Sequence, residues 1–142
     1  MAHTLAKWGP YGLAALRIIT ALLFVQHGLM KLVSFPGPQA GVPDPMPVIV
    51  VVAAWIEIVG GSLIAVGLLT RSTAFLCSGT MAVAYFVVHA PQSVWPGLNG
   101  GEGAIFFCLI FFHLVFAGPG AVSLDGVLRE RKGLQASDAA SR

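Results

Sequence analysis

The stretch STAFLCSGTMAVAYFVVHAPQSVWPGLNGG, residues 72–101, contains no Asp, Glu, Lys or Arg. A helix on the surface of a soluble protein carries charged or polar side chains on its outer face at every turn, so this stretch does not belong to such a helix. The whole chain agrees, because 56% of its 142 residues are hydrophobic and only 10% are charged, against about 45–50% and 25% in a soluble domain. The sequence therefore predicts a membrane protein.

Four apolar segments are long enough to cross a bilayer, which takes about 17–25 helical residues. They are residues 13–33, 47–69, 72–91 and 101–118. Segments rich in proline and glycine separate the first two and the last two, and such segments mark turns. The predicted fold class is all-α, a four-transmembrane-helix bundle within residues 13–125. An N-terminal cytoplasmic segment (1–12) precedes it, and a polar cytoplasmic tail (126–142) follows it. From Arg129 onward this tail is expected to be a frayed helix or disordered.

The basic residues predict the orientation of these spans. An even number of spans puts both termini on one side, which then holds seven of the eight basic residues: Lys7, Arg17, Arg71, Arg129, Arg131, Lys132 and Arg142. Only Lys31 lies on the other side. Cytoplasmic loops carry the excess of Lys and Arg, so we expect both termini in the cytoplasm and the chain in the bacterial inner membrane.

Two arginines and two glycines are assigned structural roles. Arg17 and Arg71 are expected to set the topology, and the side chain of Arg17 is expected to reach the lipid headgroups. Gly60 and Gly61 are expected to let neighbouring helices approach closely.

Ionisable side chains are costly inside a bilayer, so each needs a partner or a function. At a rise of about 1.5 Å per residue, Glu57 falls near the middle of its span and His27 about 6 Å outward of it. His27 and Lys31 are four residues apart and share one helix face. We therefore expect a polar cluster in the outer half of the bilayer, composed of His27, Lys31, Glu57, His89, Asn99 and Glu102.

This cluster has two interpretations. It is either a paired network that holds the helices together or a pocket that opens to the outer face and binds a ligand. A closed, fully paired network would favour the structural role. A cavity beside His27 and Lys31 would favour the ligand site.

Several chemistries fit the sequence poorly. The net charge of +2 leaves no basic field for nucleic acid, and no metal-ligand set is present, so no metal site is expected. The depths of Cys77 and Cys108 differ by about 12 Å, which is beyond the reach of about 7 Å between the Cα atoms of a disulfide. A bis-histidine haem needs two imidazoles at similar depth. His27 and His89 differ by about 5 Å, which allows such a haem, but no other feature supports it and haem is not the expected cofactor. A quinone is the compatible cofactor, because its carbonyls need a His or Lys donor and a nearby acid.

The run LRIITALLFVQHGLMKL, residues 16–32, resembles the first helix of the DoxX family, which ends in H-G-x-x-K. Four further motifs follow in order along the chain. They are E-x-x-G-G from Glu57, G-L-x-T-R from Gly67, W-P-x-x-N-G-G-E from Trp95 and G-P-G-x-x-S-x-D from Gly118. Together these matches cover most of residues 13–125, and the chain is identified by them as similar to DoxX proteins.

The resemblance implies a four-helix membrane bundle and a link to membrane redox complexes, because the family is named for its similarity to a subunit of an archaeal thiosulfate:quinone oxidoreductase. It marks as recurring polar or glycine positions His27, Gly28, Lys31, Glu57, Arg71, His89, Asn99 and Glu102. We expect a redox-linked, quinone-associated membrane subunit, and whether the chain is itself an enzyme stays open. Its expected partners are membrane lipids and either other membrane subunits or further copies of the chain. The alternative is a non-catalytic accessory or scaffold subunit of a larger membrane complex.

Overall fold

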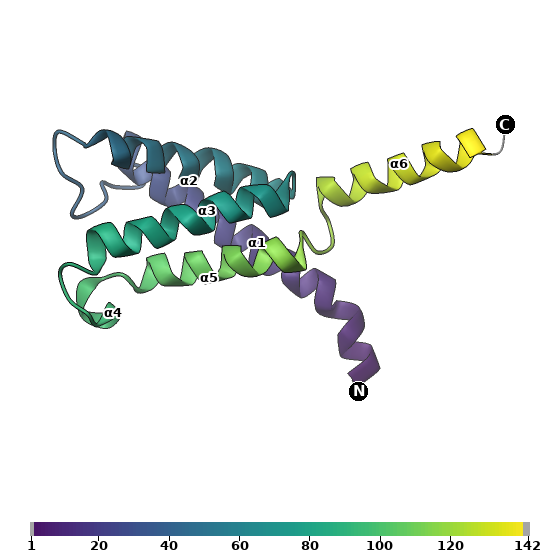
Figure 1. The fold of residues 1–142 in the computed structure, drawn as a ribbon, viewed down its shortest axis with the longest axis horizontal. Coiled ribbons are helices and arrows are strands. Elements are labelled where there is room, and N and C mark those ends of the chain that lie inside the picture. Colours follow the sequence, from purple (N-terminus) through teal and green to yellow (C-terminus); the bar gives the residue numbers. More distant parts are fainter. Residues whose placement is uncertain (1, 141–142) are drawn as a thin grey trace.

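The computed structural model describes residues 2–140, and within them it contains helices and no strands. The elements in chain order are α1 (Ala2–Val33), α2 (Val48–Val66), α3 (Thr70–Ala84), the π-helical turn η1 (Tyr85–His89), α4 (Pro96–Asn99), α5 (Glu102–Ala117) and α6 (Leu124–Ala140). The four apolar helices α1, α2, α3 and α5 lie alongside one another, whereas α6 and the start of α1 extend beyond them (Figure 1). The predicted all-α fold class is confirmed.

Three helical segments are long and apolar enough to cross a membrane. They are Leu5–Val33, Val48–Val66 and Thr70–His89, the last of which includes η1. The fourth apolar helix, α5, is shorter at 16 residues. The first helix begins at Ala2, so residues 2–12 are helical and continuous with the apolar segment that follows them.

The bundle has two ends that differ in how its helices are connected. At the turn end, Gly67–Leu69 joins α2 to α3, and residues 118–123 join α5 to α6. At the loop end, residues 34–47 join α1 to α2, and α4 lies between η1 and α5. The turn end is on the right in Figure 1 and the loop end is on the left.

The helices pack through small residues and aromatic rings. α1 contacts mainly α2, and α3 contacts mainly α5. At Gly28 of α1 an added Cβ would lie 2.6 Å from the carbonyl oxygen of Ala54, so the backbones of α1 and α2 cross closely. An added Cβ at Gly60 would lie 2.6 Å from Cys77 Sγ, and one at Gly61 would lie 2.7 Å from Val25. A side chain at any of these three positions would push the helices apart.

The aromatic core lies between α1 and α5, and the outward faces of the helices remain apolar. Phe24 is fully buried, and its ring lies 4.8 Å from that of Phe111 and 5.3 Å from that of Phe107, centre to centre. Large apolar side chains on the outward faces are exposed, for example Trp55 and Phe75. Such an outer surface suits acyl chains rather than water.

The two cysteines lie at similar depths, so the expected difference of about 12 Å is wrong. Ser78 Oγ donates a hydrogen bond of 2.9 Å to the carbonyl oxygen of Cys108, which places Cys108 level with the neighbour of Cys77. The error arose because the expected depths were counted from the ends of the two predicted spans, as if those ends were level, whereas the register of α3 against α5 sets Ser78 beside Cys108. Both cysteines are nevertheless free, since Cys77 faces Gly60 of α2 rather than α5.

Candidate functional site

A buried ion pair joins α1 to α2 in the half of the bundle nearer the loop end. Glu57 lies in the middle of α2 and is only 1% exposed. Lys31, in the last turn of α1, donates a hydrogen bond from Nζ to Glu57 Oε1. The close crossing at Gly28 makes this contact possible, because it brings the Cβ of Glu57 next to the backbone of α1.

The second carboxylate oxygen of Glu57 leaves the pair incompletely satisfied. Glu57 Oε2 is buried and has no hydrogen-bond partner among the described residues. A buried polar group without a partner costs about 1–3 kcal/mol, and more when it is charged. The network around Glu57 is therefore not the closed, fully paired one that a purely structural role would favour.

His27 lies one turn before Lys31 on α1. Its Nδ1 atom is 2.8 Å from the carbonyl oxygen of Leu23. A carbonyl oxygen only accepts hydrogen bonds, so Nδ1 carries the proton and donates it. Nε2 is then an acceptor when the ring is neutral, and it becomes a donor when the ring is protonated. The ring also meets Phe107 of α5 edge to face at 5.3 Å between centres.

His89 and Asn99 form a separate group at the loop end. His89, the last residue of η1, donates from Nδ1 to the backbone oxygen of Asn99 at 3.0 Å. The side chain of Asn99 is buried, donates to the carbonyl of Ser93 at 2.8 Å and accepts from the amide of Gly101 at 2.7 Å. These bonds hold the α4 segment against the start of α5, so both polar atoms of the Asn99 side chain are used to shape this loop.

Glu102 stands apart from both groups. It is exposed in the first turn of α5, where a carboxylate interacts favourably with the positive end of the helix dipole. Within residues 2–140, the hydrogen bonds and the ion pair connect neither Glu102 nor His89 to Glu57. Of the six residues expected in one cluster, the structure pairs Lys31 with Glu57 and places His27 one helical turn from Lys31 on α1.

Arg17 forms a second polar site, at the turn end, that sequence reasoning missed. The side chain is completely buried, so the expectation that it reaches the lipid headgroups is wrong. Its guanidinium donates to four backbone carbonyls: those of Ile64 at 2.6 Å, Ala65 at 2.6 Å, Pro119 at 2.8 Å and Val122 at 2.9 Å.

The reason for the error is the position of Arg17 along α1. The helix continues for four turns before Arg17, and residues 118–123 fold over it. One signal was available in the sequence, because Trp8 and Tyr11 precede Arg17 and aromatic residues of this kind concentrate at the membrane–water interface. Arg17 lies on the apolar side of both.

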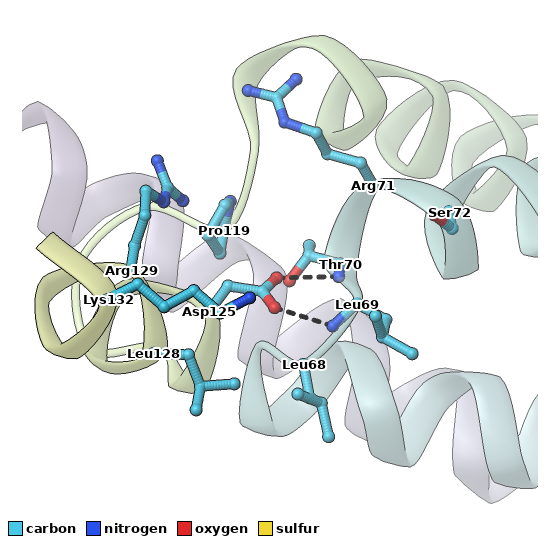
Figure 2. A pocket seen from close by; sticks show the side chains of 10 residues that line it. All are labelled: Leu68, Leu69, Thr70, Arg71, Ser72, Pro119, Asp125, Leu128, Arg129 and Lys132. Atoms are coloured by element: carbon cyan, nitrogen blue, oxygen red, sulfur yellow. Dashed lines mark hydrogen bonds between the residues drawn. The ribbon is translucent and has the colours of Figure 1, made fainter. Parts of the chain in front are cut away.

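Two more side chains at the turn end satisfy helix ends. Arg71 donates to the carbonyls of Val115 and Phe116 in the last turn of α5. Asp125 accepts hydrogen bonds of 2.9 Å from the backbone amides of Leu69 and Thr70 at the start of α3 (Figure 2). A helix leaves its first amides and its last carbonyls without intrahelical partners, so Arg17, Arg71 and Asp125 complete the ends of α2, α5 and α3.

The electrostatics of Asp125 follow from these bonds. Partial burial would raise the pKa of its carboxyl group, but hydrogen bonds from Thr70 and Leu69 and the positive charge of Arg129 outweigh that effect. The pKa of Asp125 therefore lies below its usual value, and the group is ionised at neutral pH. Two motifs, G-L-x-T-R and G-P-G-x-x-S-x-D, thus meet in one network that locks the turn end.

The surface of the protein is hollowed at the turn end. One hollow of about 380 Å³ lies between the α2–α3 turn and α6, and a second of about 320 Å³ lies beside it. Neither of them is lined by His27, Lys31 or Glu57. Neither hollow is therefore the cavity beside His27 and Lys31 that was expected of a ligand site.

Comparisons with known proteins agree with the motifs. The model of the DoxX family matches residues 12–90. An uncharacterized protein of Haemophilus influenzae is 44% identical over 130 residues, which cover 87% of this chain and 95% of the relative. The inner membrane protein YqjF of Escherichia coli is 29% identical over 138 residues, covering 88% of this chain and 98% of YqjF.

CatD of Bacillus subtilis, which is provisionally named an oxidoreductase, is 30% identical over 119 residues, covering 80% of this chain and 84% of CatD. No solved structure matches the chain. The family match covers more than half of the sequence and agrees with helices that are long and apolar enough to span a membrane. The chain therefore belongs to the DoxX family and is an integral protein of the bacterial inner membrane.

Proposed function

We propose that this protein is a redox-linked membrane subunit that binds a quinone headgroup at His27, Lys31 and Glu57. The observation that carries the proposal is the unpartnered carboxylate oxygen of Glu57, buried beside its ion pair with Lys31. A membrane helix rarely retains an ionisable residue without a function. Here the residue also has a free acceptor, as a ligand site would require.

The donors and acceptors of this group fit a quinone. Lys31 Nζ has three N–H donors and uses one of them on Glu57, so others are free to bind a carbonyl oxygen of the ring. His27 Nε2 and Glu57 Oε2 are acceptors that can take up the proton of a hydroxyl group. A bound quinone supplies two-electron, two-proton redox chemistry. The part of this chain is to orient the ring and to accept or deliver protons, while a partner subunit exchanges the electrons.

Two further observations support the proposal. The relative CatD is provisionally named an oxidoreductase, which agrees with a redox role. The charge distribution supports the topology that we also propose, in which α1, α2, α3 and α5 each cross the bilayer with both termini in the cytoplasm. Even without the buried Arg17, six basic residues then lie on the cytoplasmic side and only Lys31 lies on the other. In that orientation the Lys31–Glu57 pair lies in the outer half of the membrane, where a lipid-soluble ligand can reach it.

The second candidate function is that of a non-catalytic scaffold, and α6 favours it. This helix extends away from the bundle (Figure 1) and exposes Leu124, Val127, Leu128 and Leu134. An exposed row of apolar side chains on a projecting helix suits contact with another protein. In a scaffold, the Lys31–Glu57 pair would serve only to hold α1 against α2.

A binding experiment separates the two functions. The purified full chain is titrated in detergent with a short-chain ubiquinone, with decanol as the control for nonspecific partitioning, and its thermal unfolding temperature is followed. A ligand that binds only the folded state raises this temperature. The test variant is Lys31→Met/Glu57→Gln, which removes the ionic donor and the acid without leaving a buried charge unpaired. The matched control is Lys7→Met/Glu130→Gln, which changes the same residue types at exposed positions.

We expect ubiquinone, but not decanol, to raise the unfolding temperature of the wild type and of the control variant. The test variant should fold and show no such rise. If the wild type gives no response to ubiquinone while both variants still co-purify with the same membrane proteins, the quinone proposal fails and the scaffold function stands.

A further inference from the structure

The larger hollow at the turn end combines positive charge with an apolar rim. Ten residues line it: Leu68, Leu69, Thr70, Arg71, Ser72, Pro119, Asp125, Leu128, Arg129 and Lys132. Figure 2 shows Arg71 and Arg129 on either side of Pro119, with Lys132 extending toward Asp125. The hollow is thus formed by three segments of the chain: the α2–α3 turn with the start of α3, the residues after α5, and the first three turns of α6.

The charges in this hollow leave a cationic surplus. Three of the lining residues are basic and one, Asp125, is acidic. Both oxygens of Asp125 already accept backbone amides of the α2–α3 turn. Arg129 and Lys132 form no ion pair within the described residues. Arg71 uses only Nη1 on the end of α5, so its Nε and Nη2 groups remain available as donors.

The position of the hollow is that of the membrane–water interface. It lies at the ends of α2 and α3, both of which belong to segments able to cross a membrane. Trp8 and Tyr11 are exposed and pack on each other near the same end of α1, and such residues concentrate at headgroup level. Pro10 lies between these two residues in the sequence, and its carbonyl oxygen accepts a hydrogen bond from the amide of Ala121. Since Ala121 follows Pro119 of the hollow by two residues, this bond places the aromatic pair near the hollow.

The rim of the hollow supplies the apolar part of the surface. Leu69 is 61% exposed and Leu128 is 46% exposed. In water these side chains would gain nothing from their exposure, but acyl chains next to a headgroup would cover them. A free inorganic phosphate would use only the cations, whereas a phospholipid would use the cations and the leucines together.

We propose that this hollow binds the phosphate-bearing headgroup of an anionic phospholipid. Arg71, Arg129 and Lys132 contact the phosphate, and Leu69 and Leu128 contact the beginning of the acyl chains. The site is independent of the quinone proposal, because it shares no residue with His27, Lys31 and Glu57. A bound lipid fixes the first turns of α6 at the membrane surface and thereby sets the direction in which that helix projects.

The test is lipid binding to the full chain in detergent, measured by native mass spectrometry with palmitoyl-oleoyl phosphatidylglycerol, the corresponding phosphatidylcholine, and inorganic phosphate. The test variant is Arg129→Gln/Lys132→Gln. The matched control is Lys7→Gln/Arg131→Gln, which removes the same charge at exposed positions that do not line the hollow. A third variant, Arg129→Lys/Lys132→Arg, keeps both charges at the site.

We expect one phosphatidylglycerol to bind to the wild type in preference to phosphatidylcholine. A basic residue near an anionic membrane surface contributes about 1 kcal/mol, so losing two of them should weaken binding about 30-fold. The charge-swapped variant should bind within about threefold of the wild type, and so should the matched control. The result that overturns the proposal is equal weakening in the test and control variants, which would mean that only the overall charge matters. It is also overturned if phosphatidylcholine binds as well as phosphatidylglycerol, or if inorganic phosphate displaces the lipid at equimolar concentration.

Discussion

Replacement of Arg17 by methionine tests whether the turn end is held by side-chain bonds to helix ends. Methionine keeps much of the length and apolar volume of the arginine stem but has no hydrogen-bond donor. In the wild type the guanidinium donates to four carbonyls, those of Ile64, Ala65, Pro119 and Val122. In the variant these carbonyls lose that donor.

The size of the loss can be worked out bond by bond. The carbonyl of Ile64 keeps one partner, because it also accepts the amide of Gly67 at 3.0 Å. The carbonyls of Ala65, Pro119 and Val122 depend on Arg17 for the bonds described. Each unsatisfied buried acceptor costs about 1–3 kcal/mol, and the bonds to Ala65 and Val122, which are only part-buried, fall at the low end. The Arg17→Met variant should therefore lose at least about 3 kcal/mol of unfolding free energy. Arg17→Lys should lose less, since one ammonium group can still bond to some of the carbonyls.

The measurement is reversible unfolding in mixed detergent micelles titrated with SDS, followed by helical circular dichroism. The matched control is Arg71→Met, since Arg71 is exposed and water can replace its bonds to the last turn of α5. We expect the control to lose about 1 kcal/mol or less. The reasoning would be refuted by an Arg17→Met variant within about 0.5 kcal/mol of the wild type, or by Arg17→Lys and Arg17→Met losing equal amounts.

Three other predictions concern the remaining charges and the topology. Lys31→Met should destabilise the fold by about 3–5 kcal/mol, because it leaves Glu57 buried and unpaired. Adding Glu57→Gln should recover part of that loss in SDS titrations. Strictly additive losses would show that the two residues are uncoupled. Asp125 has a lowered pKa in the folded state, so its contribution to the free energy of unfolding is complete at neutral pH and is lost as the pH falls below about 4. The stability difference between the wild type and Asp125→Asn should therefore shrink over that range. A difference independent of pH would contradict the capping role. A cysteine introduced by Ala40→Cys should react with a membrane-impermeant reagent from the periplasmic side of the inner membrane, and labelling from the cytoplasmic side would reverse the proposed topology.

The amino-acid sequence by itself determined the helical membrane character of this protein. That property is local, because a stretch of about 20 apolar residues without charge has few alternatives to a membrane-spanning helix. The charge-free stretch 72–101 and the three other apolar segments were therefore sufficient to predict helices in the right order. The motifs likewise identified the family without any knowledge of the fold.

Only the tertiary structure decided what the polar residues contact. Depth counted along a helix predicted one cluster from His27 to Glu102, but contact also depends on which face each helix presents to its neighbours. The close crossing at Gly28 brings Glu57 to Lys31, whereas η1 and α4 bond His89 to Asn99 and leave Glu102 exposed. None of these relations is visible in the spacing of residues along one helix.

The same limit explains Arg17 and the cysteines. A basic residue near one end of an apolar run looks like a topology signal, and only the folding of residues 118–123 over α1 shows that it is a buried donor to the ends of other elements. Similarly, the relative depth of Cys77 and Cys108 depends on the register of α5 against α3. Helix formation is governed by the residues within each segment, but register, facing and burial are set by packing between segments that are distant in sequence.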